Sequence, residues 1–183
     1  MRCFIAIEIP AVIRRDLRAF ALGLRAEYPN LRVPAEDTIH LTLRFLGELP
    51  PDRVERAGAA LTGALAGSGG AEATLSGLGV FPERGPARIL WTGAACGDRL
   101  EAWRGAAEVA AAAAGLPPEK QAFRPHVTIG RFRDGLARTE AATLVARADT
   151  LRPCAFAVSA VSLWSSDLNA GGPRHTKLKD IGL

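Results

Sequence analysis

Cysteine is scarce in this chain of 183 residues, and no apolar run is long enough to span a lipid bilayer. Cys3, Cys96 and Cys154 lie far apart and are odd in number, which excludes a disulfide framework and a CxxC metal site. The alanine-rich stretch 106–114 is interrupted by Glu108, so it is too short and too weakly apolar for a transmembrane helix. The first residues lack the long apolar segment and cleavage site of a secretory signal. We therefore expect a globular cytoplasmic protein with reduced cysteines and no membrane contact.

Lysine is also rare, so arginine supplies almost all of the positive charge. Lysine occurs only at Lys120, Lys177 and Lys179, although 23 basic residues stand against 19 acidic ones and the net charge is +4. The planar guanidinium of arginine fits phosphate oxygens, which favours a nucleotide or nucleic-acid partner. A skewed codon composition in a chain rich in alanine and glycine explains the same excess, and composition leaves both explanations open.

Apolar residues recur in two kinds of pattern along the chain, and together they predict an α+β fold. Short apolar or alternating runs indicate strands, and apolar residues spaced by three and four indicate helices. The series occurs twice, without a flexible linker between the copies, so we expect residues 1–183 to form one domain of two pseudo-symmetric lobes. The predicted strands are 3–9, 31–33, 38–46, 73–80, 87–94, 125–133, 154–164 and 174–181, the predicted helices are 12–24, 50–65, 97–115 and 138–148, and a turn is predicted at 169–173.

Two of the chain's three histidines occur in the same local sequence. The motifs are HLTL at 40–43 and HVTI at 126–129, one in each half of the chain. In a strand the side chains alternate, so each histidine shares a face with its threonine while the apolar residues point to the core. Pseudo-symmetry would bring the two polar faces together. The sequence therefore predicts two imidazoles and two hydroxyls around one groove.

This set of side chains suits acid and base catalysis on a phosphodiester. An imidazole with an unperturbed pKa near 6.5 accepts a proton in one state and donates it in the other. Threonine hydroxyls and arginines donate hydrogen bonds to phosphoryl oxygens as charge develops. Two alternatives stay open: ordinary solvent-facing strands with threonine chosen for β-propensity, and a zinc site, although no third ligand stands at metal spacing. We predict no metal and no cofactor.

The motifs and their flanks together resemble a known family. The segments 2–7, 40–48 and 123–131 resemble the two-histidine phosphoesterase superfamily, and within it the RNA 2′,3′-cyclic phosphodiesterase branch, also called the 2′-5′ RNA ligase family. The resemblance extends over nearly the whole chain, and the doubled motif is its specific part. Weaker matches are 79–82, 89–91, Ser166, Leu168, Gly172 and Pro173.

The resemblance implies a bilobal α+β fold in which antiparallel sheets form a V-shaped cleft with helices outside. It also implies hydrolysis of a terminal 2′,3′-cyclic phosphate to a 2′-phosphomonoester. His40 matches the position that protonates the 3′ leaving oxygen, and His126 matches the position that activates water. Thr42, Thr128 and Arg131 match phosphate-binding positions.

Strand alternation makes separate predictions for two arginines near the motifs. Strict alternation points Arg131 away from the groove, but a bulge at Gly130 would turn it back. Arg44 shares the face of His40 and Thr42 by period two, which predicts a phosphate or nucleobase contact, with a surface salt bridge as the alternative.

Three further residues are candidates for substrate contact. Arg124 stands in a necessarily extended stretch before a proline, and Phe4 offers an aromatic platform, with core packing as its alternative. His175 stands where relatives often have a tyrosine. It could stack on a base or donate a hydrogen bond, and the alternative is an exposed strand histidine.

The expected substrate is RNA with a 2′,3′-cyclic phosphate end, either a tRNA fragment, another processed end or a small cyclic nucleotide. The rival reaction is 2′-5′ ligation, in which an RNA 5′-hydroxyl replaces water, and water at about 55 M makes hydrolysis the expected direction. A rival of another class is a non-catalytic binder of RNA ends or nucleotides, against which the two intact motifs weigh. We expect the protein to be a monomer.

Overall fold

The computed structural model describes residues 1–169 and 172–183, and in these residues it has nine strands and four α-helices. The α+β class predicted from the sequence is confirmed. The elements in chain order are β1 (Arg2–Glu8), α1 (Ala11–Gly23), β2 (Leu31–Arg32), β3 (His40–Glu48), α2 (Pro51–Leu65), β4 (Ala71–Phe81), β5 (Ala87–Ala95), α3 (Arg99–Ala113), β6 (His126–Leu136), α4 (Arg138–Val145), β7 (Cys154–Val158), β8 (Ala160–Asn169) and β9 (Gly172–Gly182), with short 3₁₀ turns at Leu24–Ala26, Glu36–Thr38 and Ala148–Thr150.

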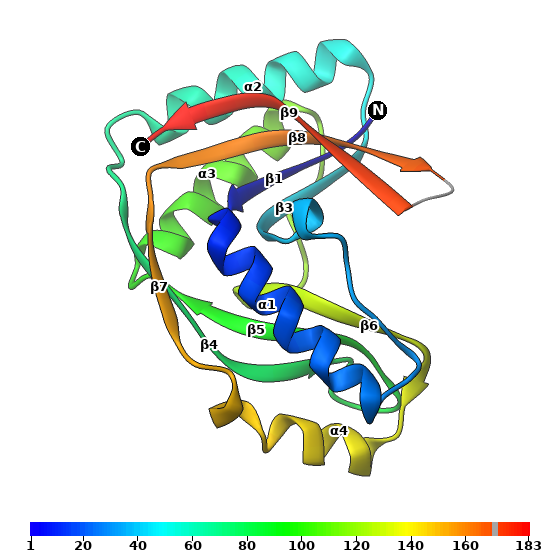
Figure 1. The fold of residues 1–183 in the computed structure, drawn as a ribbon. Coiled ribbons are helices and arrows are strands. Elements are labelled where there is room, and N and C mark those ends of the chain that lie inside the picture. Colours follow the sequence, from blue (N-terminus) through cyan, green and yellow to red (C-terminus); the bar gives the residue numbers. More distant parts are fainter. Residues whose placement is uncertain (170–171) are drawn as a thin grey trace.

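The strands form a single curved antiparallel sheet (Figure 1). Its order is β7-β4-β5-β6-β3-β1-β8-β9, with the short strand β2 also paired to β6. Strands β3 and β6 meet at the centre, where Leu41 lies opposite Val127. The sheet therefore consists of two four-stranded halves joined at the two strands that carry the histidine motifs.

The predicted internal repeat is visible in the order of the elements. The series β1-α1-β3-α2-β4 is repeated as β5-α3-β6-α4-β8. The last strand of each repeat crosses over, because β4 pairs with β5 and β8 pairs with β1. Each half of the sheet is thus completed by a strand from the other repeat, which binds the two halves into one body.

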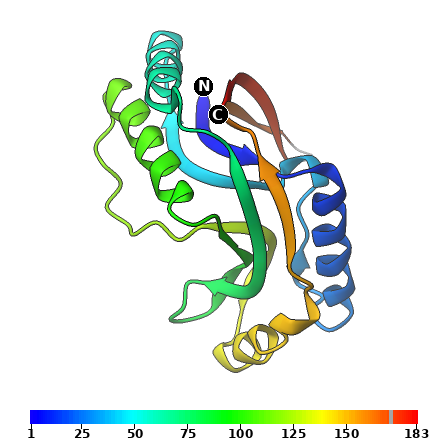
Figure 2. The same ribbon diagram turned by 90° about the vertical axis from the view of Figure 1, so that its left-hand side faces the viewer.

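Two of the four helices, α2 and α3, lie side by side, while α1 and α4 lie apart from them (Figure 2). Helices α2 and α3 pack on each other, with α3 against β3 and α2 against β9, whereas α1 packs near β6 and α4 near β4. Ile13, Leu17 and Ala21 recur every four residues in α1, so one stripe of this helix is buried. Within residues 1–169 and 172–183, no helix combines the length and the apolar character needed to cross a membrane.

Several boundaries differ from the sequence prediction, and two of the differences change the elements themselves. The predicted strand 154–164 is two strands, because the chain leaves β4 after β7 and joins β1 as β8, passing from one half to the other (Figure 1). Apolar residues continue through this change of partner, so the sequence predicts one strand, although the buried positions shift by one residue between Val158 and Val161. The predicted helix 138–148 ends at Val145 and continues as a 3₁₀ turn. The predicted turn at 169–173 includes residues 170 and 171, which lie outside the described residues.

Candidate active site

The two histidine motifs lie side by side at the centre of the sheet. Leu41 pairs with Val127, and both side chains are completely buried on the core face. In an antiparallel pair this register sets His40 on the side of Thr128 and Thr42 on the side of His126. These four polar side chains are only partly buried and alternate to the opposite face from the core. The structure therefore gathers the predicted imidazoles and hydroxyls on one face.

Both imidazoles are held in the same way by their own strands. Nδ1 of His40 lies 2.8 Å from the carbonyl oxygen of Thr38, and Nδ1 of His126 lies 2.6 Å from that of Arg124. A carbonyl oxygen only accepts hydrogen bonds, so each Nδ1 carries the proton and donates it. In the neutral ring Nε2 is then unprotonated. Each histidine consequently presents Nε2 as the atom that accepts or, when charged, donates a proton.

Aromatic side chains enclose His40. The Phe4 ring stacks on it with centroids 4.7 Å apart, and the His175 ring meets it edge-on at 5.2 Å. Burial, reinforced by the charge of His175, lowers the pKa of His40 from its ordinary value of 6.5 to about 4. The charges of Arg131 and His126 act in the same direction, which shows how close these groups are, while the hydrogen bond to Thr38 opposes them.

His126 has a similar aromatic setting in the other half of the sheet. Phe81 lies edge-on to its ring at 5.0 Å, and the Trp91 ring is 6.0 Å away. Trp91 packs over Gly79 so closely that a Cβ there would lie 2.1 Å from the indole ring. Only glycine at that position leaves room for the ring beside His126.

Arg131 returns to the face of the histidines through a β-bulge. Trp91 pairs with Thr128 and Leu90 pairs with Gly130, so Ile129 is an extra residue in β6. After this bulge Arg131 is exposed on the face of Thr128. A Cβ at Gly130 would lie 2.6 Å from Cδ1 of Leu31, which explains the glycine there. The bulge proposed from the sequence is present.

A bulge at the equivalent place in β3 turns Arg44 to the face opposite to the predicted one. Ala6 pairs with Thr42 and Ile5 with Arg44, so β3 also contains an extra residue, Leu43. Arg44 is turned away from the face that carries the histidines and is only 9% exposed. The expectation that Arg44 shares the face of His40 is wrong, because the extra residue shifts the alternation by one.

Arg44 has a structural environment on the side of α3. Its guanidinium pairs with Glu108 and with Glu119, each at 3.0 Å. A further hydrogen bond of 2.7 Å reaches the carbonyl oxygen of Pro117. These contacts tie β3 to α3 and to the segment that follows it.

Phe45 lies on the face of the histidines in place of Arg44. It was not among the candidates predicted from the sequence. Its side chain is 59% exposed, and its ring centroid lies 6.2 Å from that of Phe4. Phe45 follows His40 by five residues, as Arg131 follows His126. Comparing the two motifs position by position would have found it.

The three remaining candidates, Arg124, Phe4 and His175, have different surroundings in the structure. Arg124 forms an ion pair with Glu83 at the exposed rim of the half that contains β5 and β6. Phe4 is 3% exposed, which favours its packing alternative, because it supports His40 and presents no free face to a base. His175 is not an exposed strand histidine, since it is partly buried and meets the rings of Phe4 and His40 edge-on.

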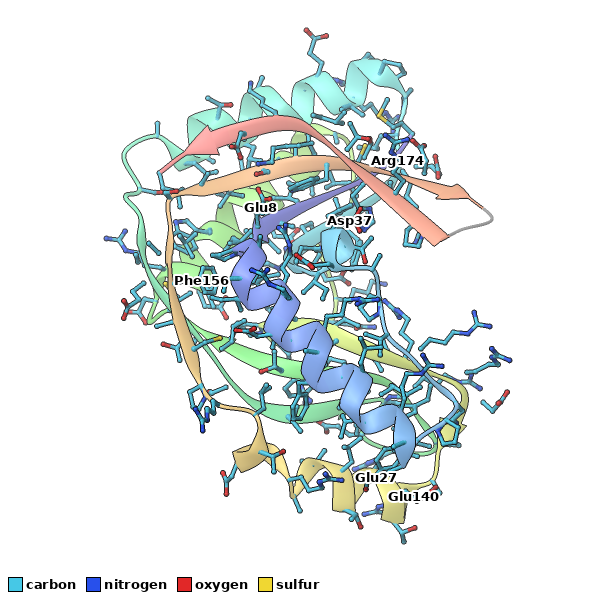
Figure 3. All side chains as sticks on the ribbon, in the orientation of Figure 1. Glu8, Glu27, Asp37, Glu140, Phe156 and Arg174 are labelled. Carbon is cyan, nitrogen blue, oxygen red and sulfur yellow. The ribbon has the colours of Figure 1, made fainter. Side chains whose placement is uncertain are left out.

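A small cavity separates His175 and His40 from two acidic side chains. Its volume is about 20 Å³, and Arg14 lines it together with the two histidines and the two acids. The acids are Glu8 and Asp37, which are labelled in Figure 3. Burial lowers the pKa of His175, and the nearby charge of Asp37 opposes this. In the described part of the chain, Nδ1 of His175 has no hydrogen-bond partner. Among residues 1–169 and 172–183, no three His, Cys, Asp or Glu side chains cluster as a set of metal ligands.

Comparisons with known proteins show which proteins this chain resembles. A family model described as the 2′-5′ RNA ligase superfamily matches residues 9–170. An RNA 2′,3′-cyclic phosphodiesterase of Methanothermobacter thermautotrophicus is 24% identical over 179 residues, covering 98% of this chain and 97% of its own. The Escherichia coli K12 protein of the same name is 30% identical over 191 residues, covering 97% and 94%.

Solved structures share the fold over the full length. The Thermus thermophilus protein TT0787 superposes with a TM-score of 0.77 at 26% identity, covering 100% of this chain and 98% of its own. Escherichia coli LigT complexed with 3′-AMP superposes with a TM-score of 0.75 at 29% identity, covering 100% and 97%.

Proposed function

This chain belongs to the 2′-5′ RNA ligase superfamily, and from that membership we propose that it is an RNA 2′,3′-cyclic phosphodiesterase. One observation carries the proposal. At the junction of β3 and β6, two histidines with matching Nδ1 hydrogen bonds lie beside two threonines on one face of the sheet. The chain acts as one bilobal unit, since each half of the sheet supplies one histidine and one threonine.

The proposed reaction places the cyclic phosphate between the two Nε2 atoms. Thr42, Thr128 and Arg131 donate hydrogen bonds to the non-bridging oxygens. His126 Nε2 takes a proton from water as the water oxygen forms a bond to phosphorus. The bond from phosphorus to O3′ breaks, and His40 Nε2 gives its proton to O3′. The products are a 2′-phosphomonoester and a free 3′-hydroxyl, and proton exchange with solvent resets the two rings.

The acid role requires His40 to be charged when the substrate is bound. Burial lowers the pKa of His40 to about 4, so the ring by itself is neutral at neutral pH. The anionic phosphate beside Nε2 favours the charged form and raises this pKa. The substrate thus brings about the protonation that its own leaving group needs. The rate should follow a bell-shaped pH profile, because one ring must be neutral and the other charged.

Phe45 is proposed to hold the base of the terminal nucleotide. Its ring is exposed on the groove face and lies next to the aromatic pair of Phe4 and His40. Every nucleobase has a π-face, so stacking on Phe45 would tolerate any sequence. This suits an enzyme that recognises a type of RNA end.

Hydrolysis is the direction proposed for the cell. Ligation would need an RNA 5′-hydroxyl held where water attacks, and water is far more concentrated. We further propose that the protein works as a monomer in the cytoplasm on the ends of RNA fragments, including those of tRNA.

The test is conversion of a short RNA that ends in a 2′,3′-cyclic phosphate, with EDTA present. We expect a 2′-phosphomonoester as the product, because the bond to O3′ is the one that breaks. Tight binding without conversion would support the non-catalytic binder instead. Activity that disappears in EDTA and returns with zinc or manganese would overturn the metal-independent mechanism. A 3′-phosphate product would contradict the assigned leaving oxygen.

A further inference from the structure

Three exposed arginines continue from Arg131 along the outer end of β6. Arg133 follows in the same strand, Arg32 lies on β2 and Arg88 lies on β5. We name Arg32, Arg88 and Arg133 the arginine row. None of the catalytic steps described above uses them.

The register of β2 and β6 places Arg32 on the face of the active site. Arg32 lies directly opposite Arg131, and the neighbouring pair, Leu31 and Phe132, is buried on the core face. Arg32 and Arg131 therefore point to the same side of the sheet as the histidines.

The other two members adjoin this pair. The backbone N–H of Arg133 donates to Asn30, so the pairing with β2 continues past Arg131. Alternation returns Arg133 to the face of Arg131, about 7 Å further along the strand. Nη1 of Arg88 lies 3.5 Å from the carbonyl oxygen of Arg133, which places Arg88 beside it.

The charges of the row have no acidic counterpart. In the described residues none of the three forms an ion pair, whereas Arg44, Arg104 and Arg147 each pair with a glutamate. Like charges on neighbouring strands repel each other, so a bound anion would relieve this repulsion.

Nearby acids are engaged elsewhere or point away. Glu27 pairs with Arg147 at 2.7 Å, and Glu140 accepts a hydrogen bond from the backbone of Ala137 at the start of α4 (Figure 3). Asp134 follows Arg133 and alternates to the other side of β6. The row therefore stays a local concentration of positive charge.

We propose that the arginine row binds the backbone phosphates of the nucleotides that precede the cyclic end. The preferred substrate is then a single-stranded oligoribonucleotide and not a mononucleoside cyclic phosphate. This inference rests on the proposed function, because it takes Arg131 as the phosphate contact from which the strand continues. Guanidinium groups fit phosphate oxygens, and positions on an open sheet surface suit contact with a backbone that carries charge at regular intervals.

The test compares two triple variants on two substrates. Arg32→Gln/Arg88→Gln/Arg133→Gln removes the row, and Arg15→Gln/Arg53→Gln/Arg152→Gln removes the same charge from exposed positions elsewhere. The substrates are a hexaribonucleotide and a mononucleoside, each with a 2′,3′-cyclic phosphate. We expect the row variant to lose about tenfold or more in kcat/KM on the hexaribonucleotide at low salt and to keep its activity on the mononucleoside. The control variant should retain both activities.

Salt dependence gives a second readout. Each phosphate contact on a single strand contributes about −0.7 to the slope of log affinity against log salt concentration. Loss of three contacts should therefore make this slope less negative by about 2 in the row variant. Equal losses in the two triple variants, or unchanged hexaribonucleotide kinetics in the row variant, would overturn the proposal.

A binding assay separates this proposal from the proposed function. Fluorescence anisotropy of the labelled hexaribonucleotide on His126→Ala, with and without the row substitutions, needs no turnover. If the wild type hydrolyses neither substrate, the proposed function fails, while weaker binding after loss of the row still supports the row. Unchanged binding contradicts the row whatever the outcome of the activity assay.

Discussion

Strands β3 and β6 are built alike but carry different side chains at equivalent places. Both have a histidine anchored through Nδ1 to a carbonyl two residues earlier, and both have a bulge after the threonine. Five residues beyond the histidine, however, one strand exposes Phe45 and the other exposes Arg131. The backbones of the two strands are alike, whereas the side chains that they expose differ in chemical character. One half exposes an apolar ring, which we propose contacts a base, and the other exposes a positive charge, which we propose binds phosphate.

The side chains that surround the two histidines also differ. His40 is packed against Phe4 and against a second titratable ring, His175, whereas His126 is flanked by Phe81 and Trp91. A titratable neighbour makes the charge on His40 sensitive to what binds. Such a difference allows one ring of a symmetric pair to serve as the acid and the other as the base.

The largest expected effect comes from removing either member of the pair. His40→Ala and His126→Ala should each lower the rate on an RNA 2′,3′-cyclic phosphate by at least about a hundredfold, because a general acid or base is lost. Steady-state kinetics measure this, with circular dichroism as the check on folding. Near-normal activity in a folded variant would contradict the assignment.

Arg131→Gln should have the next largest effect. It removes a charged donor from the phosphoryl oxygens, so we expect a loss of about a hundredfold in kcat that is similar for a mononucleoside and an oligonucleotide. Arg44→Gln is the matched control, since Arg44 faces α3 and its loss should lower stability and leave kcat close to wild type. The reverse result would mean that the bulges do not set these orientations.

Phe45→Ala should show a smaller and more selective effect. Loss of a stacking platform costs about 1–3 kcal/mol per base, so KM should rise roughly tenfold while kcat changes little. A ribose 2′,3′-cyclic phosphate without a base serves as the control substrate. Its KM should be the same for wild type and variant, and an equal rise on both substrates would show that Phe45 supports the fold and does not hold a base.

The smallest effect concerns stability against pH. The pKa of His40 is about 4 in the folded protein and near 6.5 when unfolded, so the unfolded state binds more protons between these values. Stability from the neutral ring is therefore lost as pH falls from about 6.5 to about 4. His40→Phe should reduce the fall in unfolding free energy between about pH 7 and pH 5.5 by roughly 1 kcal/mol, measured by urea denaturation. An unchanged fall would contradict the buried, neutral state of His40.

Much of the site follows from the sequence because strand alternation is a strong constraint. It correctly sets His40 and Thr42 on the opposite face from Leu41, and the glycine at 130 signals the bulge before Arg131. The matching bulge at Leu43 carries no glycine, so Arg44 and Phe45 are misplaced by one residue. The shape of a bulge depends on the neighbouring strand, which one strand's sequence does not contain.

The fold shows the same limit. The pattern of apolar residues predicts most strands and helices, but it does not show that β7 and β8 pair with different halves of the sheet. The surroundings of His175 were also beyond the sequence, because they depend on contacts with Phe4 and His40 from distant strands. Pairing partners and tertiary contacts are the part that requires the structure.

The division of roles between His40 and His126 is tested most directly by changing the leaving group. On a phosphodiester whose leaving group is a nitrophenolate, no proton has to be supplied, so an acid becomes nearly dispensable while a base does not. We expect His40→Ala to recover most of its lost rate on this substrate and His126→Ala to remain impaired. Recovery in His126→Ala alone would reverse the roles, and equal losses in both variants would show that the histidines mainly bind the phosphate.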